Sequence, residues 1–135
     1  MKNKLFTCLS LLWLCVIFGH SLMPAEVSSS ESLGILAWVI KIFPWLTHHL
    51  LRKLAHFSAF AILGGLLTGA MRPEKLPIQP VKFAFFAAFV DETIQLFVEG
   101  RSGQVSDIWI DLSGAICGAL IAFMLLKMIP SFFRK

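Results

Sequence analysis

Apolar residues along this chain gather into four long blocks with short polar connections between most of them. The blocks run from about Leu5 to Met23, from Leu54 to Met71, from Val81 to Val98 and from Ile108 to Ile129. A helix needs about 20 mostly apolar residues to cross the hydrocarbon of a bilayer, and each block approaches or reaches that length. The pattern therefore predicts four membrane-spanning helices.

The connection between the first two blocks is longer and opens with polar residues. The polar run from Glu26 to Ser32 precedes an apolar stretch, Leu33–Phe43, which Pro44 ends after only eleven residues. Because proline interrupts helices and the stretch is too short to span, we expect a helix that lies at the interface or re-enters the membrane. The alternative is a fifth span over Leu33–Leu51, which would bury one lysine and two histidines in hydrocarbon.

Composition agrees with a membrane protein of one domain. Apolar residues make up 57% of the 135 residues and charged residues 15%, against roughly 45–50% and about 25% in soluble chains. The mean hydropathy is +0.78. We therefore expect residues 1–135 to form an all-α membrane protein, a bundle of four transmembrane helices with an interfacial helix between the first and second. The net charge of +4 does not indicate a nucleic-acid partner, because no predicted helix carries a basic stripe.

The basic residues at the ends of the blocks predict the orientation. With four spans both termini lie on one side, which receives eight of the 12 lysines and arginines. The positive-inside rule then places both termini in the cytoplasm. Met1–Lys4 followed by Leu5–Phe18 also fits a signal peptide, but the bulky His20 makes Gly19-His20-Ser21 a poor cleavage site. We favour a first span that is retained.

The third block carries polar residues that are costly in a membrane. Asp91, Glu92 and Gln95 follow a mainly apolar stretch, and Asp91 lies roughly 15 Å along the helix from Val81. Each ionised carboxylate near the middle of a bilayer costs about 2.5–3.5 kcal/mol on insertion scales. Unless they are paired, protonated or hydrated, two adjacent carboxylates are therefore too costly to be incidental. We expect them to be functional.

The second and fourth blocks add polar residues at their predicted outer ends. Lys53 and His56 are three residues apart at the start of the second block, so both can face one neighbouring helix. Asp107 complements the positive start of the fourth helix, which explains it structurally. Asp111 follows one turn later and has no such explanation. Together these residues predict a polar site near the outer ends of the last three spans.

Gly114 and Gly118 form a small-xxx-small pair in the fourth block. Such a pair lets another helix approach closely, either within the chain or from a second copy. We expect packing from these glycines, and a homodimer through them is one candidate partner arrangement.

Three ordered motifs resemble those of the VanZ-like family. They are Lys53-x-x-His56-Phe57-x-x-Phe60, Asp91-Glu92-x-x-Gln95-x-Phe97-Val98-Glu99-Gly100-Arg101 and Ser106-Asp107-x-x-x-Asp111-x-x-Gly114-x-x-x-Gly118, within residues 53–118. The chain departs from the usual pattern where Phe60 replaces a tyrosine, Glu99 a proline and Asp111 an asparagine. The resemblance implies a multi-pass protein of the bacterial cytoplasmic membrane. Because the family's namesake is associated with low-level teicoplanin resistance, it also implies a link to glycopeptide tolerance, although most relatives occur without a resistance cluster.

Three functions from different classes are open on these residues. The first is the binding or modulation of an envelope component, either a membrane lipid or a lipid-linked glycan. In that case we expect the headgroup or its sugars to be bound by Lys53, Gln95, Arg101 and Asp111, with His56 beside them. In a structural bundle with no substrate, which is another of the three, the polar residues only hold the helices together.

The second function is a membrane enzyme that acts on a lipid headgroup or a lipid-linked substrate. Its candidate catalytic residues are His56, as a general base or nucleophile, and the carboxylates Asp91, Glu92 and Asp107, as bases or cation ligands. Three carboxylates and one histidine suit Mg²⁺ or Mn²⁺ better than a closed zinc site, so a divalent cation is the candidate cofactor. The sequence assigns no metal ligand by spacing.

Overall fold

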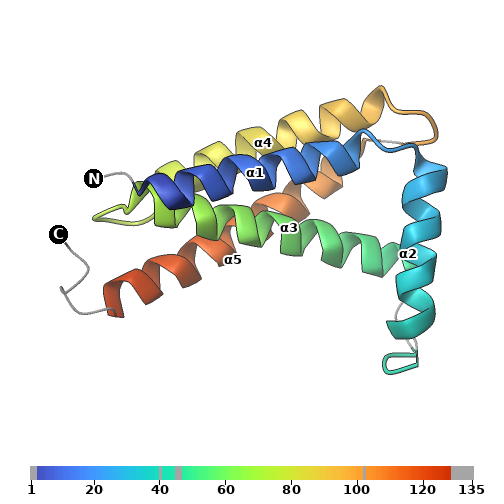
Figure 1. Ribbon diagram of the computed structural model, residues 1–135, viewed down its shortest axis with the longest axis horizontal. Helices are drawn as coiled ribbons and strands as arrows, with labels where there is room; N and C mark the ends of the chain where they lie inside the picture. Colours follow the sequence, from blue (N-terminus) through green and yellow to red (C-terminus); the bar gives the residue numbers. More distant parts are fainter. Residues whose placement is uncertain (1–2, 40, 45–46, 102, 129–135) are drawn as a thin grey trace.

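The computed structural model describes residues 3–39, 41–44, 47–101 and 103–128, and every regular element in these ranges is a helix (Figure 1). The helices are α1 (Lys4–Ser21), α2 (Ala25–Val39), α3 (His48–Met71), α4 (Ile78–Leu96) and α5 (Val105–Met128). This confirms the all-α fold.

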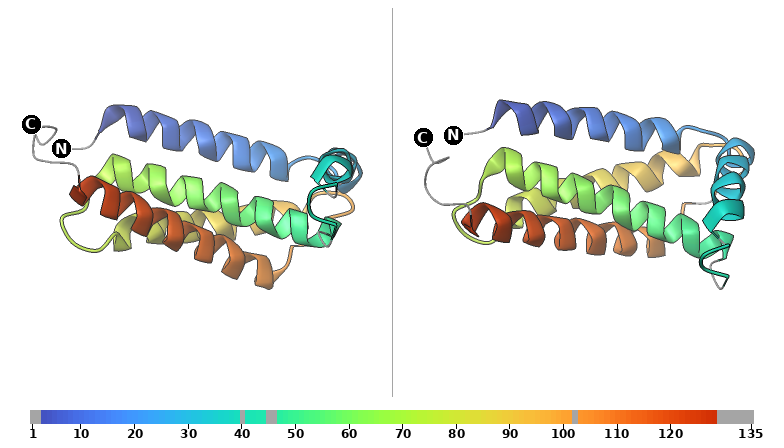
Figure 2. Two further views of the ribbon diagram at one scale, coloured as in Figure 1. Left: turned by 90° about the horizontal axis from the view of Figure 1, so that it is seen from below. Right: turned by 60° about the horizontal axis from the view of Figure 1, so that its bottom comes forward.

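Four helices, α1, α3, α4 and α5, run lengthwise beside one another, and α2 lies across one end of them (Figures 1 and 2). The amide of Ala25 donates to the carbonyl oxygen of Glu99 at 3.2 Å and joins α2 to the connection between α4 and α5. We call this the α2 end of the bundle. At the other end the amide of Asn3 donates to Ala70 O at 3.1 Å, and Lys127 Nζ donates to Glu74 O at 3.0 Å. The start of α1 and the end of α5 therefore lie together.

Three of the described helices, α1, α3 and α5, are long and apolar enough to cross a membrane. They correspond to the first, second and fourth predicted spans, although the predicted end at Ile129 lies outside the described residues. The third predicted span corresponds to α4, which is less apolar because it carries Lys82, Asp91 and Glu92 within 19 residues. Length and composition therefore establish three candidate spans and do not establish the predicted four-span bundle.

The helix predicted over Leu33–Phe43 starts earlier and ends earlier than expected. The polar run is itself helical, because α2 begins at Ala25 with Glu26 in its first turn, where a carboxylate complements the helix dipole. The chain turns at residues 41–44, and α3 begins only at His48. The alternative of a continuous fifth span over Leu33–Leu51 is therefore wrong.

The second span also begins earlier than the predicted Leu54. Thr47 is the N-cap of α3, and its side-chain oxygen accepts a hydrogen bond from the amide of Leu50 at 3.2 Å. A threonine cap satisfies one of the amides that a helix start leaves without a partner. Because α3 begins at His48, it extends more than one turn beyond the predicted start, towards α2. The basic residues of its first two turns therefore lie at the α2 end.

Helices α3 and α5 pack closely through glycines. A Cβ atom at Gly64, Gly114 or Gly118 would overlap a backbone carbonyl oxygen of the facing helix. The face of α5 that carries Gly114 and Gly118 is therefore occupied by α3 of the same chain, and the predicted packing role is confirmed. The candidate homodimer stays untested. Because α3 covers Gly114 and Gly118 in this chain, a second copy would have to contact another face of α5.

The core between the helices consists mainly of small residues, and the large apolar side chains point outward. The largest buried apolar side chains are Phe60 and Leu63 of α3, which pack among buried alanines of α4 and α5. Phe83, Phe86 and Phe89 of α4 are more than half exposed. This distribution is typical of helices that face lipid, where close backbone packing rather than side-chain burial holds the bundle together.

Candidate functional site

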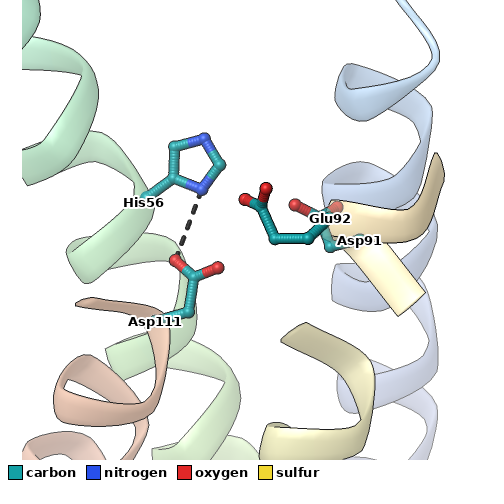
Figure 3. Close-up of side chains that lie close together, drawn as sticks. All are labelled: His56, Asp91, Glu92 and Asp111. Atoms are coloured by element: carbon teal, nitrogen blue, oxygen red, sulfur yellow. Dashed lines mark ion pairs between the residues drawn. The ribbon is translucent and has the colours of Figure 1, made fainter. Parts of the chain in front are cut away.

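Four polar side chains from three helices meet inside the bundle near its α2 end (Figure 3). His56 comes from α3, Asp91 and Glu92 from α4, and Asp111 from α5. One nitrogen or carboxylate oxygen of each lies within 4.8 Å of those of the other three. The exposed fractions of Asp91, Glu92 and Asp111 are 1%, 4% and 0%. We call these four residues the buried cluster.

Asp91 is held in place by two side-chain donors. Ser21 at the end of α1 donates its hydroxyl to Asp91 Oδ1 at 2.5 Å. Gln95, one turn further along α4, donates from Nε2 to Asp91 Oδ2 at 2.9 Å. Each oxygen of this carboxylate therefore has a donor, and its orientation is fixed by α1 and α4 together.

Glu92 follows Asp91 in the sequence, but its carboxylate is bound by the connection between α4 and α5. The backbone amide of Gln104 donates to Glu92 Oε2 at 2.8 Å. The preceding residue, Gly103, lies so close to α4 that a Cβ atom there would be 2.7 Å from the carbonyl oxygen of Glu92. Only glycine fits this approach without a shift, which explains how the α4–α5 connection reaches the carboxylate. The other oxygen, Oε1, is buried without a hydrogen-bond partner among the described residues.

Asp111 lies opposite Glu92 and contacts His56. The distance from His56 Nδ1 to Asp111 Oδ1 is 3.3 Å, and the two groups form an ion pair when the imidazole is protonated (Figure 3). Neither Asp111 oxygen has a hydrogen-bond partner among the described residues. The buried cluster thus presents unused carboxylate oxygens to an imidazole nitrogen. Such an arrangement can hold protons or a cation.

A small pocket of about 40 Å³ opens next to the cluster at the α2 end. Its lining consists of His49, Arg52, Lys53, His56, Gln104, Asp107 and Ile110. We call it the basic pocket. Lys53 Nζ lies 3.9 Å from Asp107 Oδ1 across it. His56 belongs to both the basic pocket and the buried cluster, and it connects them.

Arg101 lies outside the basic pocket that Lys53 lines, but near enough to Asp91 and Glu92 for their negative charges to act on it. Its Nη2 donates to the carbonyl oxygen of His20 at 3.1 Å, and it does not line the basic pocket. Burial lowers the pKa of the Arg101 guanidinium from its ordinary value, and the positive charge of Arg52 lowers it further. The two arginines are therefore close enough to repel each other at the α2 end.

The structure brings together most of the residues predicted for the site. His56, Asp91, Glu92 and Asp111 form the buried cluster, and Gln95 is hydrogen-bonded to it. Lys53 and Asp107 lie at the pocket, whereas Arg101 lies on the α1 side. Their predicted catalytic and binding roles stay predictions.

Sequence reasoning missed four contributors: Ser21, His49, Arg52 and Gln104. Ser21 carries a signal, because a polar residue at the end of an apolar block can face the interior, although its position in Gly19-His20-Ser21 also fits a cleavage site. Arg52 carries only the signal of a basic residue at the end of an apolar block, which predicts orientation rather than a site. Gln104 acts through its backbone amide, for which a sequence carries no signal.

A family model described as VanZ/LLP1 matches residues 6–127, which include parts of all the helices described above. No curated protein and no solved structure matches the chain.

Proposed function

Because the chain belongs to the VanZ/LLP1 family and has helices that can cross a membrane, we propose that it binds the anionic headgroup of a membrane lipid or lipid-linked envelope component. The observation that carries the proposal is the basic pocket, in which Arg52 and Lys53 lie beside His49 and His56. A phosphate group is the part of such a headgroup that these cations would bind.

The size of the basic pocket supports a small anionic group. Its volume of about 40 Å³ corresponds to roughly three water-sized positions. That is enough for a phosphate group and too little for a whole sugar headgroup or an acyl chain. The rest of the lipid would remain outside, along the exposed apolar surface of the bundle.

The charges around the basic pocket also favour an anion. The positive charge of Arg52 acts on Arg101, and Asp91 and Glu92 offset part of this repulsion; an anion bound at Arg52 would reduce it further. Asp107 neutralises Lys53 only in part, because the 3.9 Å contact is partly exposed to solvent. The pocket therefore offers more positive charge than its own carboxylate balances.

We further propose that α4 is a fourth span and that the α2 end faces outward. The four lengthwise helices alternate in direction, which returns α5 to the end where α1 starts. Most of the basic residues then lie on the cytoplasmic side. On this topology α2, with Trp38 exposed to 75%, lies along the outer interface, where tryptophan is favoured.

Cysteine labelling in intact bacterial cells tests this topology. In a variant whose native cysteines are replaced by serine, Glu99→Cys should react with a membrane-impermeant maleimide. Glu74→Cys, which places the thiol in the α3–α4 connection at the opposite end, should react only after the membrane is permeabilised. The reverse pattern would show that the termini lie outside.

Headgroup binding can be measured on the purified full-length protein in mild detergent. Native mass spectrometry after exposure to phosphatidylglycerol should show bound lipid, and Arg52→Ala should lower its apparent affinity by about tenfold, the effect of losing one charged hydrogen bond. Lys53→Ala should have a similar or smaller effect, because Lys53 is already paired with Asp107.

Two controls separate headgroup binding from general attraction to anionic lipid. Lys75→Ala removes the same charge at the far end and should leave binding unchanged, and phosphatidylcholine should bind less than phosphatidylglycerol to the unaltered protein. Equal losses from Arg52→Ala and Lys75→Ala, or no loss from either, would exclude the basic pocket as the binding site.

A second candidate function is an enzyme that acts on the bound headgroup. One observation favours it: His56 lines the basic pocket and also contacts the buried Asp111, so the imidazole can pass a proton between headgroup and cluster. The same lipid samples distinguish the two functions. A chemically altered headgroup in the protein's presence, with none for His56→Ala, would identify an enzyme rather than a binding protein.

A further inference from the structure

The geometry points to a divalent-cation site of the Mn²⁺ or Mg²⁺ class at the buried cluster. We propose that His56 Nδ1, Glu92 Oε1 and the Asp111 carboxylate bind the cation, with Asp91 completing the site (Figure 3). This inference goes beyond headgroup binding and does not depend on it, because the cluster lies inside the bundle and most residues of the basic pocket take no part in it.

The distances in the cluster suit a cation after small side-chain movements. The four donor atoms lie within 4.8 Å of one another. Ligands around an octahedral ion of this class lie about 2.1 Å from it, so that opposite ligands are about 4.2 Å apart. The side chains would have to close by only a few tenths of an ångström each, which rotation about their terminal bonds supplies.

Unused oxygens inside the cluster are an independent sign that something binds there. Glu92 Oε1 and both oxygens of Asp111 accept no hydrogen bond within the described residues, and the ion pair with protonated His56 reaches only Asp111 Oδ1. Their residues are only 4% and 0% exposed. Buried carboxylate oxygens without partners are rare, because each has lost its hydration without compensation. A cation among these oxygens would satisfy all of them at once.

The groups around the cluster already orient the proposed ligands. Ser21 and Gln95 donate to Asp91, and the amide of Gln104 donates to Glu92 Oε2, which leaves Oε1 directed inward. Metal ligands commonly have outer partners of this kind that fix their orientation. In this cluster the outer partners come from α1, from α4 and from the α4–α5 connection.

Charge and ligand type decide the class of cation. Within the described residues no lysine or arginine forms an ion pair with Asp91, Glu92 or Asp111, and His56 is the cation that contacts Asp111. Arg101 adds a more distant positive charge that acts on Asp91 and Glu92. A dication would balance two of the three carboxylates. Carboxylate oxygens favour Mg²⁺ and Mn²⁺, and one imidazole among them is better accepted by Mn²⁺.

Titration of the purified protein with Mn²⁺ tests the proposal. The full-length protein in mild detergent is stripped with EDTA and exchanged into chelator-free buffer, and the free Mn²⁺ signal is followed by electron paramagnetic resonance. We expect one Mn²⁺ bound per chain and a melting temperature that rises with Mn²⁺ concentration. Mg²⁺ should compete for the same site.

Glu92→Gln and Asp111→Asn remove the oxygens that the proposal needs while keeping the size of the side chains. Each should weaken Mn²⁺ binding at least tenfold, as even the loss of an outer partner of a metal ligand does. Glu99→Gln is the matched control, because it removes an exposed carboxylate at the same end of the bundle, and it should bind Mn²⁺ like the unaltered protein.

Several outcomes would overturn the proposal: no stoichiometric binding of Mn²⁺ or Mg²⁺, binding that survives in both cluster variants, or equal weakening by Glu99→Gln. Melting temperatures measured without metal show that a variant is folded, and if one cluster variant does not fold, the other carries the test. Headgroup binding by the EDTA-treated protein and its loss in Arg52→Ala are read separately, so that either proposal can fail without the other.

Discussion

Gly118→Ala should lower the melting temperature of the purified protein by about 10 °C, although it adds a single methyl group. That methyl carbon would overlap the carbonyl oxygen of Ala61 on α3. A backbone carbonyl cannot turn aside as a side chain can, so α3 and α5 would have to separate along their whole contact. Overpacking in a close-packed interior costs about 1–3 kcal/mol and sometimes more. A clash with a backbone atom should cost a free energy at the upper end of this range. A loss of that size corresponds to the expected decrease in melting temperature.

Gly19→Ala provides the control for this experiment. It makes the same substitution in a helix, but no atom lies within 4 Å of the added carbon. Because alanine favours helix over glycine by up to about 1 kcal/mol, the melting temperature should stay the same or rise slightly. Similar losses in the two variants would mean that α3 and α5 do not pack through Gly118 as described.

His56→Ala should destabilise the EDTA-treated protein by about 3 kcal/mol. The substitution removes the imidazole that lies 3.3 Å from Asp111 Oδ1 and leaves this fully buried carboxylate without its partner. An uncompensated carboxylate within a membrane costs about 2.5–3.5 kcal/mol on insertion scales, and breaking buried ion pairs from one side costs similar amounts. Thermal or denaturant unfolding in detergent measures the loss.

Adding Asp111→Asn to His56→Ala should restore most of the lost stability, because the amide carries no charge that needs a partner. Lys53→Ala is the comparison, since the Lys53–Asp107 pair is partly exposed and its loss should cost less than about 1 kcal/mol. The argument fails if His56→Ala costs no more than Lys53→Ala, or if the second substitution gives no recovery.

The parts of the fold that follow from local physics could be predicted from the sequence. Long apolar blocks predicted α1, α3 and α5 because the length of a span is set by the bilayer. The high cost of Asp91, Glu92 and Asp111 in hydrocarbon predicted that they belong to a polar site. The structure buries all three together with His56.

The remaining features depend on contacts between distant parts of the chain. The start of α2 in the polar run could not be predicted from hydropathy, because a short helix across the end of a bundle needs little apolar surface. Ser21 donates a hydrogen bond to Asp91, which lies 70 residues further along the sequence. Arg101 donates to the backbone carbonyl oxygen of His20. Such pairings depend on how helices are placed side by side, which no periodicity records.

Among the described helices, α5 is synthesised after the others, and it completes the buried cluster. While α5 is still in the ribosome, α3 exposes the glycine-bearing face that α5 will cover, and His56, Asp91 and Glu92 lack Asp111. In a nascent chain at this stage, the polar groups of α3 and α4 therefore lack the partner that α5 provides. A chain truncated after α4 would leave His56, Asp91 and Glu92 without Asp111 permanently.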